Sequence, residues 1–147
     1  MKKTNLLAVA CSLFSVGAFA CPNLSGTFSC PDAQNGPQIV TITQSESNGI
    51  TTYYQNGEAL AADNVVKSIP DEPTFKEGKM RAYCEGDSLK VAIQGKVWDQ
   101  GQFFGDLDVV SNYSLDASSN LVDKFEGNIK SAQGDYPIGD LTTCTRQ

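Results

Sequence analysis

The 147-residue sequence contains no histidine, a single tryptophan and two methionines. The lack of histidine excludes Ser-His-Asp and Cys-His nucleophile systems and every zinc site that uses a histidine ligand. No Cys-x-x-Cys spacing occurs, which excludes a redox-active dithiol of that type. Carboxylates, lysines and tyrosines remain, so we expect a protein that is not an enzyme and that holds no metal or cofactor.

Basic residues are also few, since eleven Lys and Arg stand against seventeen Asp and Glu, for a net charge of −6. Without Lys2 and Lys3 the remaining nine basic and seventeen acidic side chains give −8. Nucleic-acid binding needs a basic surface, and anionic lipid attracts one as well. We therefore expect neither nucleic acid nor an anionic lipid surface as a partner.

The only long apolar run lies at the N-terminus. Lys2 and Lys3 precede the mostly apolar residues 6–17, and Ala18-Phe19-Ala20 has the small-x-small pattern of a signal-peptidase site. The run is shorter than the about 20 residues of a spanning helix. The pattern predicts a cleaved secretory signal peptide over residues 1–20. Residues 21–147 then form a single exported domain without a membrane span, in the bacterial periplasm or outside the cell.

Cysteine numbers agree with export. Cys11 leaves with the signal peptide, and the four remaining cysteines are Cys21, Cys30, Cys84 and Cys144. An even number in an oxidising compartment predicts two disulfides. The alternative is a lipoprotein anchored through Cys21. The residues before Cys21 match the lipoprotein pattern poorly, and lipidation would leave one thiol without a partner.

Short β-type segments separated by turns dominate residues 21–147. Asn-Gly dipeptides, typical of tight hairpin turns, occur at 35–36, 48–49 and 56–57. Leu89, Val91 and Ile93 alternate with more polar residues, as in a strand with one buried face. The pattern predicts strands over Leu24–Cys30, Gln38–Gln44, Ile50–Gln55, Asn64–Ile69, Lys79–Cys84, Ser88–Gly95, Phe103–Leu115, Leu121–Ile129 and Ile138–Arg146.

No stretch has a helical period, and residues 70–78, with two prolines and four charges, are predicted as a surface loop. Eight to ten short strands at this spacing indicate an all-β antiparallel barrel or sandwich. Sequential hairpins favour the up-and-down barrel, because its closure removes exposed edges. We expect a disulfide-stapled monomer of this kind.

Barrel closure also bears on the disulfide pairing, for which the four cysteines leave three arrangements open. In an up-and-down barrel the first and last strands pair antiparallel. Because Cys21 precedes the first strand and Cys144 nearly ends the last, we favour Cys21–Cys144 together with Cys30–Cys84.

The segment Asn23-Leu24-Ser25-Gly26-Thr27-Phe28 resembles the opening of lipocalin-like (calycin) barrels, in which a Gly-x-Trp motif begins the first strand. Those barrels also carry a basic residue near the end of the last strand, stacked on that aromatic ring. Here Phe28 would replace the tryptophan and Arg146 would be the base. The resemblance implies a barrel whose mouth admits a small apolar molecule.

Aromatic residues in the predicted walls and rims are the candidate ligand-binding residues: Tyr53, Tyr54, Trp98, Phe103, Phe104 and Tyr113. The alternative is that these rings only fill the core or pair across strands. Asp106 and Asp108 share a strand face and have the chemistry of a hydrolytic pair or a cation site, but we interpret them as a solvated strand end.

Three functional hypotheses follow. The first is an exported binding module for a small apolar or amphipathic ligand. The second is a structural or interaction protein with a filled core, such as an inhibitor or envelope component. The third and weakest is an enzyme. A continuous internal cavity favours the first over the second, whereas an enzyme needs converging carboxylates with opposed pKa shifts.

Overall fold

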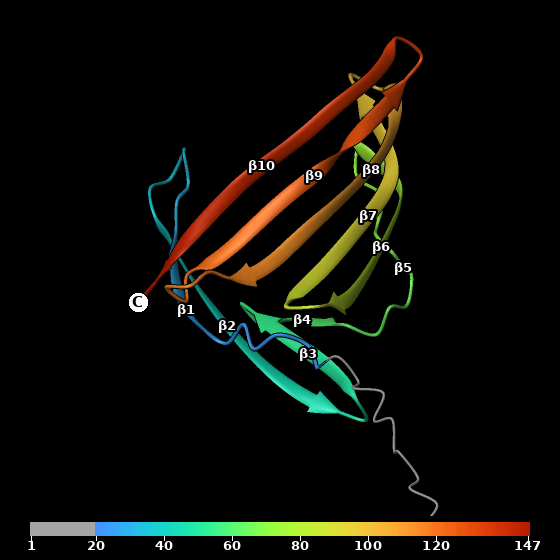
Figure 1. The fold of residues 1–147 in the computed structure, drawn as a ribbon. Helices are drawn as coiled ribbons and strands as arrows, with labels where there is room; N and C mark the ends of the chain where they lie inside the picture. The colour runs from blue at the N-terminus through green and yellow to red at the C-terminus, as the bar shows by residue number, and fades with distance from the viewer. Residues whose placement is uncertain (1–19) are drawn as a thin grey trace, which may run out of the picture.

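The computed structural model describes residues 20–147, and the predicted signal peptide of residues 1–20 lies outside this range except for Ala20. Ten antiparallel strands form one sheet (Figure 1). Their bounds are β1 (Gly26–Cys30), β2 (Gln38–Ser47), β3 (Ile50–Gln55), β4 (Glu58–Ala61), β5 (Lys67–Ser68), β6 (Phe75–Glu85), β7 (Ser88–Asp99), β8 (Gln102–Leu115), β9 (Leu121–Ser131) and β10 (Gly134–Arg146).

The strand order is β4-β3-β2-β1-β10-β9-β8-β7-β6-β5, so each strand pairs with its sequence neighbour and β1 pairs with β10. This confirms the predicted all-β antiparallel fold with hairpin connections. Figure 1 shows strands β1–β4 lying below the lower ends of the long strands β6–β10. Strands β4 and β5 are the two edges of the described sheet, so no strand pair closes it into a barrel.

A backbone contact links the two edge regions nevertheless. The Asn64 N–H, which follows β4, donates a hydrogen bond to the Ala82 carbonyl of β6 over 2.8 Å. Ala82 itself is buried and belongs to the core. The segment after β4 therefore returns to the long strands, and the curved sheet wraps around one shared apolar core.

Turn chemistry explains the hairpins. Asn48-Gly49 and Asn56-Gly57, the two-residue connections of β2–β3 and β3–β4, all have positive φ, between 52° and 85°. Gln100-Gly101 makes the same kind of turn between β7 and β8, with φ of 48° and 79°. Such turns match the twist of paired strands. The two Asn-Gly hairpins at 48–49 and 56–57 are confirmed.

The predicted secondary structure was wrong in part between β4 and β6. Strand β4 was not predicted, and of the expected strand Asn64–Ile69 only Lys67–Ser68 is a strand. The predicted loop 70–78 extends only to residue 74, because β6 begins at Phe75. The β6–β7 register shifts between Lys76 and Lys79, so this part of β6 contains a bulge.

The predicted disulfide pairing is also wrong. The structure joins Cys21 to Cys84 and Cys30 to Cys144. Strands β1 and β10 pair antiparallel, with Phe28 opposite Arg146. Two residues further along β1, Cys30 therefore lies opposite Cys144, which is two residues before Arg146. Cys21 lies five residues before β1, outside the part of the chain that pairs with β10. It forms its disulfide with Cys84 of β6 instead. Two disulfides are present as predicted, with their partners exchanged.

Candidate functional site

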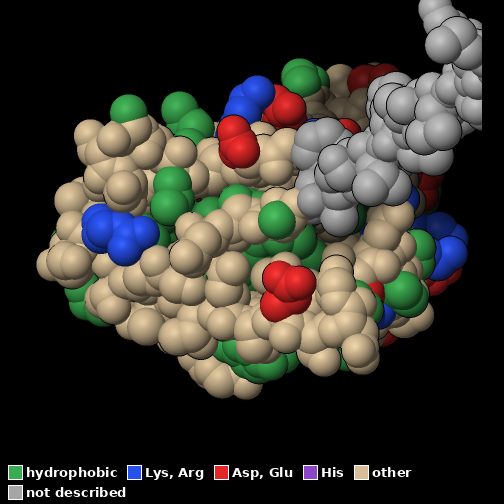
Figure 2. Space-filling view, turned by 60° about the horizontal axis from the view of Figure 1, so that its bottom comes forward, with side chains coloured by type: hydrophobic (Ala, Val, Ile, Leu, Met, Phe, Trp, Pro, Cys, Tyr) green, Lys and Arg blue, Asp and Glu red, His purple; other side chains and the backbone are tan. Residues whose placement is uncertain are grey.

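The main candidate site is a cavity of about 480 Å³ between β2–β4 and the long strands β6–β9. Figure 2 shows hydrophobic side chains gathered in a hollow on this side of the molecule. The lining residues are Leu24, Ile42, Tyr53, Gln55, Asn56, Glu58, Ala59, Leu60, Met80, Leu89, Val91, Tyr113 and Leu121. Most are apolar, and the polar ones come mainly from the β3–β4 hairpin, so the cavity combines an apolar wall with a polar rim.

Tyr53 is the most buried of the predicted aromatic residues that reach this cavity. Its side chain is 5% exposed, and its hydroxyl donates a hydrogen bond to the Pro22 carbonyl over 2.8 Å. Burial raises the pKa of Tyr53 to about 12, so the phenol stays neutral around pH 7. The Tyr53 ring is therefore a neutral part of the cavity wall, and its hydroxyl is already hydrogen-bonded to Pro22.

Tyr113 lines the opposite wall, on β8, and is paired in register with Asp123 of β9. The pKa of Tyr113 is raised by burial and by the negative charge of Asp123. Burial also raises the pKa of Asp123, and the nearby Asp140 adds to the shift, while hydrogen bonding with Tyr113 opposes it. The Asp123 Oδ1 atom is buried without a hydrogen-bond partner among residues 20–147. Asp123 therefore carries a charge that this face of the sheet destabilises.

At neutral pH, Asp123→Asn should raise the free energy of unfolding by less than about 1 kcal/mol, since water still screens this partly exposed group. A pKa raised above the ordinary 3.8 means that the folded state binds the proton more tightly than the unfolded state. Wild-type stability should thus fall as pH rises through the window from 3.8 to the raised pKa. The extra stability of Asp123→Asn over the wild type should develop as pH rises through this window, and it should be absent at pH values below the window.

Urea unfolding at a series of pH values measures this difference. Asp135→Asn, which changes an exposed carboxylate on β10, is the control with the same change in net charge. An Asp123→Asn advantage that persists unchanged below pH 3.8, or that Asp135→Asn shares, would contradict the assignment.

The segment from Cys21 to Leu24 closes one side of the cavity, which sequence reasoning missed. Leu24 is only 1% exposed and lines the cavity, and its N–H donates to Gln44 Oε1 over 2.9 Å. The disulfide from Cys21 to Cys84 fixes the start of this segment on β6. The contact between the Pro22 carbonyl and Tyr53 fixes it on β3. The segment therefore bridges the two walls of the cavity.

The other four predicted ligand-binding aromatics lie away from this cavity. Tyr54 follows Tyr53 in β3, is 38% exposed, and its hydroxyl lies 3.2 Å from Ser45 Oγ. Phe103 and Phe104 line a separate cleft of about 210 Å³ between the tips of the β7–β8 and β9–β10 hairpins. Trp98 packs edge-on against Phe103, with ring centroids 6.0 Å apart. The structure thus brings Tyr53 and Tyr113 to one cavity and leaves the rest outside it.

Phe28 and Arg146 meet as the lipocalin-like resemblance implies. The Arg146 guanidinium carbon lies 5.0 Å from the centroid of the fully buried Phe28 ring. The Arg146 side chain also donates to the carbonyls of Ser119 and Ser25. A Cβ atom at Gly26 would lie 2.7 Å from Arg146 Nη1, so glycine leaves the room that this stacking needs.

A third hollow, a charged groove of about 370 Å³, contains the two carboxylates of the Asp106-Leu107-Asp108 motif. Asp106 is paired in register with Lys96 and Lys130, and Asp108 accepts a hydrogen bond from Gln94 Nε2 over 3.2 Å. Both carboxylates are exposed. Neighbouring cations and amides therefore surround them, and no other carboxylate of residues 20–147 joins them in a group of three metal-ligating side chains.

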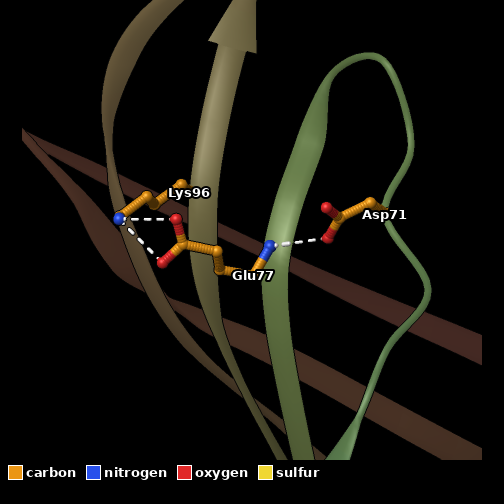
Figure 3. A network of polar contacts seen from close by, with 3 residues as sticks. All are labelled: Asp71, Glu77 and Lys96. Carbon is orange, nitrogen blue, oxygen red and sulfur yellow. Dashed lines mark hydrogen bonds and ion pairs between the residues drawn. The ribbon is translucent and has the colours of Figure 1, made fainter.

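The same groove contains the β6 bulge. Glu77 adopts a left-handed φ of 52°, and its N–H donates to Asp71 Oδ1 over 2.8 Å (Figure 3). Its carboxylate accepts two hydrogen bonds from Lys96 Nζ, at 2.8 and 2.7 Å. Hydrogen bonding to Glu77 raises the pKa of Lys96. These contacts fix the bulge to β7, which gives Glu77 and Lys96 a structural role in the sheet.

No protein-family model, curated protein or solved structure matches this chain. Residues 20–147 contain no helix long and apolar enough to cross a membrane. The function must therefore be inferred from the cavity and its chemistry.

Proposed function

We propose that residues 21–147 form an exported, non-enzymatic binding module that holds a small apolar or amphipathic molecule within an open, lipocalin-like barrel. The observation that carries the proposal is the cavity of about 480 Å³, a size typical of small-molecule sites. Its wall includes Leu24, Leu89 and Leu121, each at most 5% exposed, and its rim contains Gln55, Asn56 and Glu58. An apolar wall with a polar rim suits a molecule with an apolar body and a polar end.

The remaining features support this reading. The Phe28–Arg146 stacking agrees with the lipocalin-like resemblance, and the contact between Asn64 and Ala82 joins the regions of the two sheet edges. Two disulfides suit an oxidising compartment such as the periplasm or the extracellular space. Pairing of Cys21 with Cys84 also favours a disulfide role for Cys21 over lipidation.

A structural or interaction protein acting through its surface is the second candidate. The observation in its favour is the group of exposed rings at the hairpin tips, where Phe103 is 49% exposed and Phe104 37% exposed. Tyr136 joins this group, with its ring centroid 5.6 Å from that of Phe104. A surface role of this kind requires no ligand in the central cavity, so a binding measurement separates the two candidates.

Leu60→Trp should weaken binding of a neutral apolar probe, N-phenyl-1-naphthylamine, by about tenfold or more, which corresponds to about 1.4 kcal/mol. Leu60 lines the cavity and is partly exposed, so the larger ring can occupy the ligand's space without overpacking the core. Probe fluorescence titrated with the exported wild-type protein and the variant measures the change.

Leu141→Trp is the matched control, because Leu141 is 64% exposed on β10 and absent from the cavity wall. Its affinity for the probe should equal that of the wild type. Native mass spectrometry of the protein as isolated provides an independent measurement, and a retained small molecule would identify the ligand class. Failure of the wild type to bind the probe, or equal affinity in all three proteins, would argue against the central cavity as the site.

A further inference from the structure

The charge around the central cavity is of one sign. Among its thirteen lining residues Glu58 is the only charged one, and none is Lys or Arg. Glu58 begins β4 and is paired with Gln55 across the Asn56-Gly57 turn, so it stands at the rim contributed by this hairpin. A polar ligand group at this rim therefore meets a carboxylate and amides, and no base.

The Glu58 carboxylate is available for such a contact. The four ion pairs within residues 20–147 use other acidic residues, namely Asp63, Glu77, Glu85 and Glu126. Glu58 is exposed and accepts no side-chain hydrogen bond within the same residues. A positively charged ligand group would thus pair with it without breaking an existing interaction.

The walls below the rim add no positive charge to the cavity. Tyr53 and Tyr113 line opposite walls of this cavity. Asp123, paired in register with Tyr113 on the same face of the sheet, adds negative charge beside Tyr113. The net charge of −8 over residues 21–147 attracts cations over a longer range.

An anionic head group would meet the opposite situation. A carboxylate at the rim lies beside Glu58 and is partly removed from water with no cation of the wall to pair with it. We propose that the ligand is a cationic amphiphile, with an apolar tail between the tyrosine walls and an ammonium or amine group at Glu58. This inference rests on the proposed binding function and specifies the charge of the ligand.

Competition against N-phenyl-1-naphthylamine tests the proposal with three compounds of equal chain length: decyltrimethylammonium, decanol and decanoate. The cation should displace the probe at about tenfold lower concentration than decanoate, with decanol between them. Added salt should reduce the difference, because the Debye length falls from about 10 Å at ~0.1 M to about 3 Å at ~1 M. Glu58→Gln should reduce the preference for the cation over decanoate to within about threefold.

Glu126→Gln is the matched control, since it removes the same charge from an exposed position on β9 outside the cavity wall. It should keep the wild-type preference. Probe binding without a preference for the cation, or a preference for decanoate, would overturn the charge assignment and leave the binding function intact. Absence of any probe binding would overturn the binding function itself. A loss of preference in Glu126→Gln equal to that in Glu58→Gln would show that net charge, and not the rim contact, sets the preference, which would also overturn the proposal.

Discussion

Replacing Cys30 and Cys144 together by serine should lower the free energy of unfolding by about 5 kcal/mol. The Cys30–Cys144 bond spans a sequence separation of 114 residues, and in the chain-entropy account a loop of this length stabilises the folded state by about that amount. Domains of this size have a total stability of about 5–15 kcal/mol. We therefore expect a variant that is marginally stable, as measured by urea unfolding under non-reducing conditions.

The other disulfide gives the internal comparison. Cys21–Cys84 spans a separation of 63 residues, so the paired serine variant should lose about 4 kcal/mol. The loss should be accompanied by weaker probe binding, because this bond fixes the segment that carries Leu24 into the cavity wall. The Cys30–Cys144 variant should keep its probe affinity wherever it remains folded. Equal loss of affinity in both folded variants would contradict the role of the Cys21–Leu24 segment.

Peptide mapping of the non-reduced protein tests the pairing directly. No Lys or Arg lies between Cys21 and Cys30, so trypsin leaves both on one peptide and cannot distinguish the observed pairing from Cys21–Cys144 with Cys30–Cys84. Pepsin cleaves next to Leu24 and Phe28 and therefore separates Cys21 from Cys30. It works at acidic pH, at which thiols are protonated and disulfide exchange is suppressed. We expect a Cys21 peptide linked to Cys84 and a Cys30 peptide linked to Cys144. A Cys21–Cys144 link would contradict the β1–β10 register.

The pairing shows where sequence reasoning lost precision. The antiparallel contact between the first and last strands was predicted correctly from the hairpin pattern. The partner of each cysteine depends on the register of that contact, which no turn fixes because β1 and β10 are far apart in sequence. Cys30 lies within β1 and Cys21 lies before it, as predicted, but the sequence pattern does not show which of the two lies opposite Cys144.

The aromatic candidates met a similar limit. Neighbouring residues in a strand point to opposite faces, so Tyr53 and Tyr54 cannot both line one cavity. Period two therefore predicts that one ring of the pair is buried, but only the packing of β3 shows that it is Tyr53. Trp98 and Phe103 are paired across the β7–β8 hairpin. The position of that hairpin relative to the cavity depends on the curvature of the whole sheet.

Two elements carried weak or no local signals. Strand β4 has the sequence Glu-Ala-Leu-Ala, which combines residues of low β-propensity, although the Asn56-Gly57 turn requires a strand on each side. Leu24 was placed in the first strand. In the structure it precedes β1, and tertiary contacts with Gln44 and the Cys21–Cys84 bond bury it. The hairpin turns and the alternation of Leu89 and Val91 were predictable because both depend on short-range geometry.

Phe28→Ala should cost about 3–5 kcal/mol, the range for removal of a fully buried aromatic ring. The Phe28 side chain is 0% exposed in the core and lies beneath the Arg146 guanidinium, so its loss leaves a void and removes the surface on which Arg146 stacks. The effect should exceed that of other single aromatic truncations on this chain. Urea unfolding with both disulfides intact measures it.

Graded variants keep this prediction testable if Phe28→Ala fails to fold. Phe28→Leu retains part of the buried volume and should lose less than Phe28→Ala. Phe104→Ala, which truncates a ring that is 37% exposed, should lose less than about 1.5 kcal/mol. Arg146→Met keeps an apolar side chain over Phe28 but removes the hydrogen bonds to the Ser25 and Ser119 carbonyls. It should cost about 1–3 kcal/mol. If Phe28→Ala and Phe104→Ala lose similar stability, the Gly26–Phe28–Arg146 cluster does not hold the β1–β10 contact together, and the resemblance to lipocalin-like barrels loses its structural support.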